Sequence, residues 1–121
     1  MTTTLNEAGY VHAFTRRVRR ALRGVKHEVV IVDDSSTDGT FLEACRWADK
    51  ALQVRRAGQS SGLLIGIKAA RFPVVATLDV DLENPPELIP RLLEVFEKHG
   101  LDLLVACRSE LPRFSERLAS R

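Results

Sequence analysis

Two aspartates that follow a short apolar run are the residues whose types and spacing best suit chemistry. The run Val74–Leu78 predicts a buried strand, and Asp79 and Asp81 follow it with only Val80 between them. Residues two apart in extended backbone point the same way, so both carboxylates can face one cation. Such oxygens suit Mg²⁺ or Mn²⁺, which in turn hold phosphate oxygens. Glu83 continues the alternation as a candidate third ligand. The apolar strand before the motif favours metal binding over a solvated polar loop.

A second pair of acids, Asp33 and Asp34, ends another apolar run, Glu28–Val32. Ligands of open α/β sheets bind at the carboxyl ends of the strands. Two adjacent acids repel each other unless they have partners, and a ribose hydroxyl or a base N–H would be a good partner. We therefore predict ligand contact for Asp34. The alternative is capping of a helix that begins at Thr40, which Asp38 or Thr37 could do instead.

Other polar segments carry weaker signals. The loop Arg55–Gly62 leads into a helix N-terminus, which suits an anion, but an ordinary surface loop is the preferred interpretation. Five arginines form a basic face on the first predicted helix, and a solvated face is preferred to attraction by anionic lipids; they are Arg16, Arg17, Arg19, Arg20 and Arg23. Arg108 ends the last predicted strand, where it can pair with a phosphate or with a surface acid.

These candidate residues need a scaffold in which strands and helices alternate. Apolar periodicity with glycine and proline punctuation predicts helices over about 8–22, 40–49, 61–70 and 85–99, and strands over 28–32, 51–54, 74–78 and 101–106. The second helix should bury Phe41, Leu42, Cys45 and Ala48. The alternation predicts βαβ units and a mostly parallel sheet in one domain, residues 1–121. Only Met1–Leu5 precede the first helix, so the chain holds at most the tail of a strand there.

Composition bounds the functional classes. The chain is 45% apolar and 28% charged, as expected of a soluble domain, and its net charge of +2 is too weak to argue for nucleic acid. Its apolar runs are too short to span a bilayer, and its N-terminus lacks a signal-peptide pattern. Cys45 and Cys107 match no ligand spacing and are expected to be buried free thiols. These features predict a cytoplasmic protein.

Four segments, in order, carry a family resemblance: residues 4–8 (TLNEA), 31–40 (IVDDSSTDGT), 62–66 (GLLIG) and 78–90 (LDVDLENPPELIP). Together they resemble the family 2 glycosyltransferases, most closely the dolichol-phosphate mannosyltransferase branch. The resemblance spans about Thr3 to Arg108, nearly the whole chain. It implies an α/β, Rossmann-like nucleotide-sugar-binding domain of glycosyltransferase type A, with helices on both faces of a mostly parallel sheet.

The resemblance also assigns roles by position. Glu7, Asp33 and Asp34 would bind the nucleoside side of a nucleotide-diphospho-sugar. Asp79, Val80 and Asp81 would meet the diphosphate, and Asp79, Asp81 and Glu83 would hold Mg²⁺ or Mn²⁺. Asp79, Asp81 and Arg108 are the implied catalytic residues. The reaction would move a sugar such as mannose or glucose, with inversion, onto a polyprenyl or dolichyl phosphate at the cytoplasmic face of a membrane, with a second copy or a membrane-anchored subunit as candidate partner.

The sequence departs from the family at several places. Thr3 stands where the family has a proline, Leu5 replaces a base-stacking aromatic, and Arg71-Phe72-Pro73 replaces a Gly-Asp turn. The first strand and the acceptor-side segment after Arg108 are shortened, so truncation at both ends is expected. Two alternatives stay open: a truncated, non-catalytic nucleotide-sugar binder or regulatory subunit, and a phosphoacceptor receiver domain. For the shortened first strand we expect that Met1–Leu5 pairs as a stub, that a second copy donates a strand, or that the natural protein begins upstream.

Overall fold

The computed structural model describes residues 1–107 and divides the chain into two compact units, one of residues 1–91 and one that begins at Leu92. The strands are β1 (Thr2–Thr4), β2 (Val30–Asp34) and β3 (Lys50–Val54). The helices are α1 (Ala8–Ala21), α2 (Thr40–Trp47), α3 (Gly58–Ala69), a short 3₁₀ helix (Pro86–Leu88) and α4 (Ile89–Lys98). Among the described residues, no helix has both the length and the apolar character that crossing a bilayer needs.

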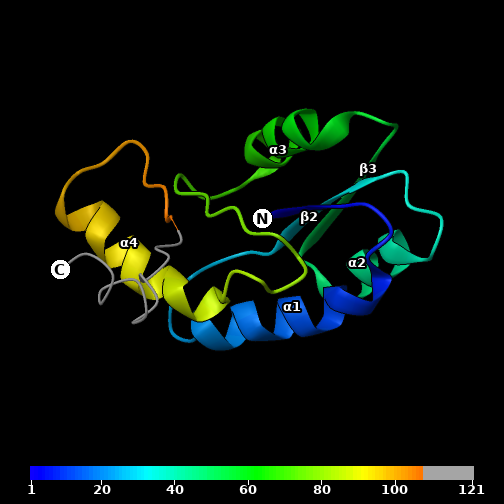
Figure 1. Ribbon diagram of the computed structural model, residues 1–121. Coiled ribbons are helices and arrows are strands. Elements are labelled where there is room, and N and C mark those ends of the chain that lie inside the picture. Colours follow the sequence, from blue (N-terminus) through cyan, green and yellow to red (C-terminus); the bar gives the residue numbers. More distant parts are fainter. Residues whose placement is uncertain (108–121) are drawn as a thin grey trace, which may run out of the picture. The chain divides into compact units, whose positions relative to one another are not determined.

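The three strands form a parallel sheet in which β2 lies between β1 and β3. Thr3 pairs with Val32, and Val32 pairs with Leu52. Within the first unit, α1 and α2 cover one face of this sheet and α3 covers the other (Figure 1). This architecture confirms the predicted α/β, Rossmann-like fold. It does not fit a receiver domain, because that fold places its first strand, not its second, between two neighbours.

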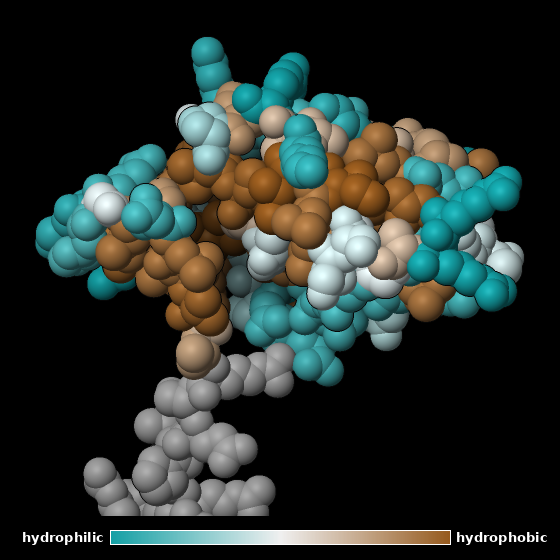
Figure 2. Space-filling model, turned by 90° about the horizontal axis from the view of Figure 1, so that it is seen from above, coloured by the Kyte–Doolittle hydropathy of each residue, from teal (hydrophilic) through white to brown (hydrophobic). Residues whose placement is uncertain are grey.

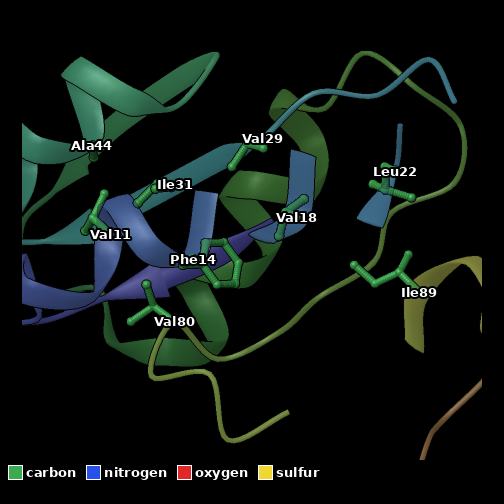
Figure 3. Close-up of a cluster of buried hydrophobic side chains, with 9 residues drawn as sticks. All are labelled: Val11, Phe14, Val18, Leu22, Val29, Ile31, Ala44, Val80 and Ile89. Atoms are coloured by element: carbon green, nitrogen blue, oxygen red, sulfur yellow. The ribbon is translucent and has the colours of Figure 1, made fainter. Parts of the chain in front are cut away.

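The core of the first unit lies between α1 and the sheet. Val11, Phe14 and Val18 repeat at helical spacing along α1 and are buried against Ile31 of β2 (Figure 3). The cluster also includes Leu22, Val29, Ala44, Val80 and Ile89. Burial of this apolar stripe, at about 25 cal/mol per Å², is the main force that holds α1 on the sheet.

The opposite face of the sheet is covered by α3, which approaches through two glycines. Gly62 and Gly66 are the buried residues of this helix. A Cβ atom at Gly62 would lie 2.9 Å from Cγ2 of Thr3, and one at Gly66 would clash with Met1 Cε and lie 3.1 Å from Cγ2 of Val32. The glycines therefore allow close contact with the strands, and the larger side chains of α3 lie on its flanks and outer face.

Two predicted strands are wrong. Residues 74–78 form no strand; two hydrogen bonds join the segment to Met1, from Met1 N to Ala76 O (2.5 Å) and from Leu78 N to Met1 O (3.2 Å). These bonds flank Thr77 in the parallel pattern, but Met1, which precedes β1, is the only described residue with backbone bonds to this segment. Residues 101–106 also form no strand, because their N–H groups find no ladder partner in the described part of the second unit.

The stub expectation for the N-terminus is confirmed, since Thr2–Thr4 pair with β2. Within α2, Ala44 is fully buried and Phe41 is half-buried, as is Ala48 just after the helix, whereas Leu42 and Cys45 are exposed. The prediction for these two residues is wrong because α2 has only one narrow face on the core. Cys107 is exposed as well, so the expectation of buried thiols fails for both cysteines.

Candidate functional site

A cavity of about 430 Å³ lies at the carboxyl ends of β1 and β2. Its wall brings together four of the predicted acids, the end of each strand and the first turns of α3. The lining residues are Thr3, Thr4, Leu5, Glu7, Val32, Asp34, Gly58, Gln59, Gly62, Asp79, Val80 and Asp81. A smaller hollow of about 170 Å³ shares Thr3, Gln59 and Asp79 with it. The site thus lies where open parallel sheets bind their ligands.

The pKa of Glu7 reflects both its partial burial and the clustering of acids in this cavity. Partial burial raises the pKa of its carboxyl group, and the neighbouring charges of Asp81, Asp79 and Asp38 raise it further, although a hydrogen bond from the Leu5 N–H opposes them. Like charges held together in one cavity destabilise one another. A bound cation would relieve this repulsion, so the cavity is chemically suited to a metal–diphosphate group.

Asp79 and Asp81 flank an anchored residue. Val80 is buried in the core beside Phe14 (Figure 3). The aspartates on either side of it line the cavity. The turn after them is held by a bond from the Glu83 N–H to Asp81 Oδ1 (3.0 Å) and by Leu82, whose φ of 66° is left-handed. Residue 83 itself does not line the cavity.

The acids fit a divalent ion by chemistry rather than by preformed geometry. Carboxylate oxygens are the ligands that Mg²⁺ and Mn²⁺ prefer. Over residues 1–107, however, no group of three acidic, histidine or cysteine side chains is arranged to hold a metal ion. Asp79 and Asp81 are candidates, because both line the cavity, whereas both oxygens of Asp34, which also lines it, already accept backbone N–H groups.

Asp34 contacts the start of α3. Its Oδ1 accepts a hydrogen bond from the Ala57 N–H (2.7 Å) and its Oδ2 accepts one from the Gly58 N–H (2.9 Å). These donors stand at the helix N-terminus, where a negative charge is favourable. Asp34 therefore joins β2 to α3 while its carboxylate remains on the cavity wall.

Asp33 lies apart from the other acids. It is fully buried, and its oxygens accept bonds from Thr4 Oγ1 (3.2 Å), Ser36 Oγ (2.5 Å), Ser36 N (3.1 Å) and Gln53 Nε2 (3.4 Å). These bonds tie the ends of all three strands together and satisfy the buried charge. The structure thus places Asp33 beneath the site and off the cavity wall, and its predicted ligand contact stays a prediction.

The loops after β1 and β2 hold each other in place. The Thr37 N–H donates to Asn6 Oδ1 (2.9 Å), and the Glu7 N–H donates to Thr40 Oγ1 (2.9 Å). Asp38 accepts bonds from the Ala8 N–H (3.2 Å) and the Thr40 N–H (3.0 Å), at the starts of α1 and α2. At the helix that begins at Thr40, the alternative raised for Asp34, the first N–H group is bound by Asp38, whereas Asp34 binds the start of α3. The loop that presents Glu7 is fixed at several points.

An ion pair joins α1 to the segment that follows Asp79 and Asp81. Arg17 donates two hydrogen bonds to the carboxylate of Glu87, at 2.9 Å and 2.6 Å. The guanidinium lowers the pKa of Glu87 to about 2. This bidentate pair fixes the 3₁₀ turn that follows Asp79 and Asp81.

Sequence reasoning missed the contribution of α3. The loop from Arg55 to Gly62 was interpreted as ordinary surface, yet Gly58, Gln59 and Gly62 line the cavity. The Gly-rich helix start was the available signal, but no local pattern showed that Asp34 would hold it. Arg108, the predicted phosphate ligand, lies outside the described residues.

Comparison with known proteins identifies the family of this chain. The family model for Glycosyl transferase family 2 matches residues 1–112. A dolichol-phosphate mannosyltransferase of Pyrococcus furiosus is 34% identical over 110 residues, which cover 87% of this chain and 31% of that protein. A dodecaprenyl-phosphate galacturonate synthase of Rhizobium johnstonii is 37% identical over 112 residues, covering 85% of this chain and 33% of its own length.

A third relative, an undecaprenyl-phosphate 4-deoxy-4-formamido-L-arabinose transferase of Pseudomonas fluorescens, is 37% identical over 113 residues, which cover 86% of this chain and 33% of the relative. The chain therefore belongs to glycosyltransferase family 2. It spans about a third of the length of the curated relatives it matches.

Proposed function

We propose that this chain provides the donor site of an enzyme that transfers a sugar from a nucleotide-diphospho-sugar to a polyprenyl phosphate. The observation that carries the proposal is the single cavity in which Glu7, Asp34, Asp79 and Asp81 meet the first turns of α3. The relatives are named for sugar transfer to or from dolichyl, dodecaprenyl and undecaprenyl phosphates, which supports the same acceptor class here. The reaction would take place at a membrane surface, on the cytoplasmic side.

Each acid has a distinct place in the proposed complex. Glu7 and Asp34 lie after β1 and β2 and would accept hydrogen bonds from the nucleoside. Asp79 and Asp81 would hold Mg²⁺ or Mn²⁺, which when bound neutralises the charge of the diphosphate leaving group. Glu83 is a further candidate ligand from the turn, and Arg108 a candidate phosphate contact.

The transfer itself needs little from the protein beyond positioning. An oxygen of the acceptor phosphate attacks the anomeric carbon, and the bond from that carbon to the distal phosphate oxygen of the donor breaks, so the configuration inverts. The phosphate acceptor is largely ionised near neutral pH, so no proton has to be removed. The described cavity supplies acids that bind and orient the donor, in keeping with a reaction without a general base.

The test is ligand-induced thermal stabilisation. Mn²⁺ with saturating GDP or UDP should raise the melting temperature by several degrees, since about 2.7 kcal/mol is gained at a hundredfold excess over Kd. Asp81→Asn keeps the acceptor for the Glu83 N–H but removes the charge, and it should abolish the metal-dependent part. Asp102→Asn, at an exposed acid that does not line the cavity, is the control. An equal shift in Asp81→Asn would contradict the metal assignment.

A second candidate is a nucleotide-sugar binder without turnover, which the acids of the described cavity would serve equally well. Radiolabelled nucleotide sugar and a polyprenyl phosphate in detergent separate the two. Formation of a labelled lipid product supports the transferase. Saturable donor binding without lipid product supports the binder.

A further inference from the structure

The second half of α3 exposes two large apolar side chains, which is unusual for a surface helix. Gly62 and Gly66 pack on the sheet, so the larger apolar side chains of the helix lie elsewhere on its circumference. Leu64 is 60% exposed and Ile67 is 45% exposed, three residues apart on the outer stripe. In the view onto this side, apolar residues gather over the helix (Figure 2). A contiguous exposed apolar patch marks an interaction site.

The charges around this face have one sign. Residues 55–78 contain four cationic residues and no acidic residue. Arg55 and Arg56 precede α3, Lys68 is exposed in its last turn, and Arg71 follows it. Arg71 pairs with Glu28 at 3.3 Å, yet its side chain is 70% exposed. Exposed apolar side chains flanked by cationic residues suit an anionic membrane surface, to which lysine and arginine are attracted.

We propose that the outer face of α3 docks on an anionic lipid bilayer, with Leu64 and Ile67 in the headgroup region and Lys68 and Arg71 on lipid phosphates. Charge favours this partner over a second copy, because a symmetric contact through α3 would bring two cationic rims together. The inference rests on the proposed function, in which the acceptor is a lipid phosphate.

Docking through α3 would also place the donor site close to the lipid. Gly58, Gln59 and Gly62 line the cavity, and Leu64 follows Gln59 by five residues on the same helix. At 1.5 Å per residue, that separation along the axis is about 8 Å. One helix therefore forms both a wall of the cavity and the proposed membrane contact.

The first experiment is sedimentation of the chain with vesicles of phosphatidylcholine, with or without phosphatidylglycerol. Binding is expected with the anionic vesicles, and Leu64→Asp combined with Ile67→Asp should weaken it about tenfold or more. Leu42→Asp is the matched control, because Leu42 is 73% exposed on α2, on the other side of the sheet. Equal loss in both variants, or no vesicle binding by the unmodified chain, would overturn the proposal.

Fluorescence quenching by brominated lipids tests the orientation. Trp47, the single tryptophan, stacks on His12 of α1 on the opposite side of the sheet, so its emission should be unaffected. In the Trp47→Phe, Leu64→Trp variant, emission should be quenched by anionic brominated vesicles. Quenching of Trp47 instead would overturn the proposal and assign the contact to the arginine-rich side of α1.

Nucleotide-induced stabilisation, measured on the same variants, separates this inference from the proposed function. Vesicle binding through α3 without any nucleotide shift would support docking and contradict the donor site. A dimer that forms without vesicles and is lost in Leu64→Asp, together with no lipid binding, would overturn docking in favour of a second copy.

Discussion

At the residue scale, Asp34 has two tasks that can be separated by experiment. Its carboxylate holds the Ala57 and Gly58 N–H groups, and it lies on the cavity wall. Asp34→Ala should weaken nucleotide binding at least tenfold. It should also lower the free energy of unfolding by about 1–3 kcal/mol, because two donors lose a charged partner. Calorimetry well below the melting temperature measures the affinity, and denaturant unfolding measures the stability.

Asp49→Ala provides the control for this variant. Asp49 accepts bonds from the Val29 N–H (2.7 Å) and from Arg19 (3.0 Å), and it does not line the cavity. It should lose comparable stability with unchanged nucleotide affinity. If both variants bound nucleotide as the unmodified chain does, the nucleoside role of Asp34 would be wrong.

The charge of Glu7 should reduce stability when no ligand is bound. Its raised pKa means that the folded chain binds its proton more tightly than the unfolded chain. Stability therefore falls as pH rises from the ordinary carboxyl range through the raised pKa. Glu7→Gln should raise the melting temperature by about 1–3 °C at pH 7, an effect kept small by solvent screening, and the gain should vanish near pH 4.

The same substitution should have the opposite effect on ligand binding. With Mn²⁺ and a nucleoside diphosphate, Glu7→Gln should gain less stabilisation than the unmodified chain, in the trade-off common at functional sites. Glu97→Gln, at an exposed residue of α4 that does not line the cavity, should change neither measurement. A pH-independent gain in Glu7→Gln would show that its carboxylate is not repelled by the neighbouring acids.

Among the helices and strands, the close contact between α3 and the sheet depends on the two buried glycines of the helix. Gly62→Ala gains helix propensity of about 1 kcal/mol but places a Cβ 2.9 Å from Thr3 Cγ2, and such overpacking costs about 1–3 kcal/mol. A net loss of up to about 2 kcal/mol is expected in denaturant unfolding. Gly9→Ala in α1 meets nothing within 4 Å and should stabilise the chain slightly. Equal effects at the two positions would contradict the packing argument.

The elements that could be predicted from the sequence are those with strong local signals. Val11, Phe14 and Val18 repeat at helical spacing, so α1 was predicted to within one residue at its C-terminus. The strand at Val30–Asp34 is a continuous apolar run that ends in acids, which also located the site. In both cases the local pattern and the tertiary environment agree.

Where the prediction failed, the missing information was a partner elsewhere in the chain. The segment 74–78 has strand composition, yet a strand also needs a neighbour, and Met1 alone provides it in the described structure. The role of α3 in the cavity depended on Asp34, a contact across 23 residues. Leu42 looked like a core residue by composition, but only the packing of α2 shows that it faces solvent.

For the sheet as a whole, the pKa of the N-terminal amine of Met1 depends on how the edge of the sheet beside residues 74–78 is closed. It donates to Ala76 O, and burial lowers the pKa of this amine to about 6 from its ordinary 8.0. A base with a lowered pKa binds its proton more tightly in the unfolded chain. The part of the stability that depends on the uncharged amine is therefore fully present above about pH 8. It should be lost as pH falls through about 6.

Extending the chain by about five to six apolar residues before Met1 tests this edge directly. The added strand would replace the buried amine with an amide N–H and give residues 74–76 a backbone partner. We expect a higher denaturant midpoint at pH 7 and loss of the stability change between pH 6 and 8. A Gly/Ser extension of equal length should remove the pH dependence alone.

Equal midpoints for all three chains, at every protein concentration, would show that the present sheet needs no further strand. A midpoint of the unextended chain that rises with concentration would instead indicate that a second copy supplies a strand at this edge.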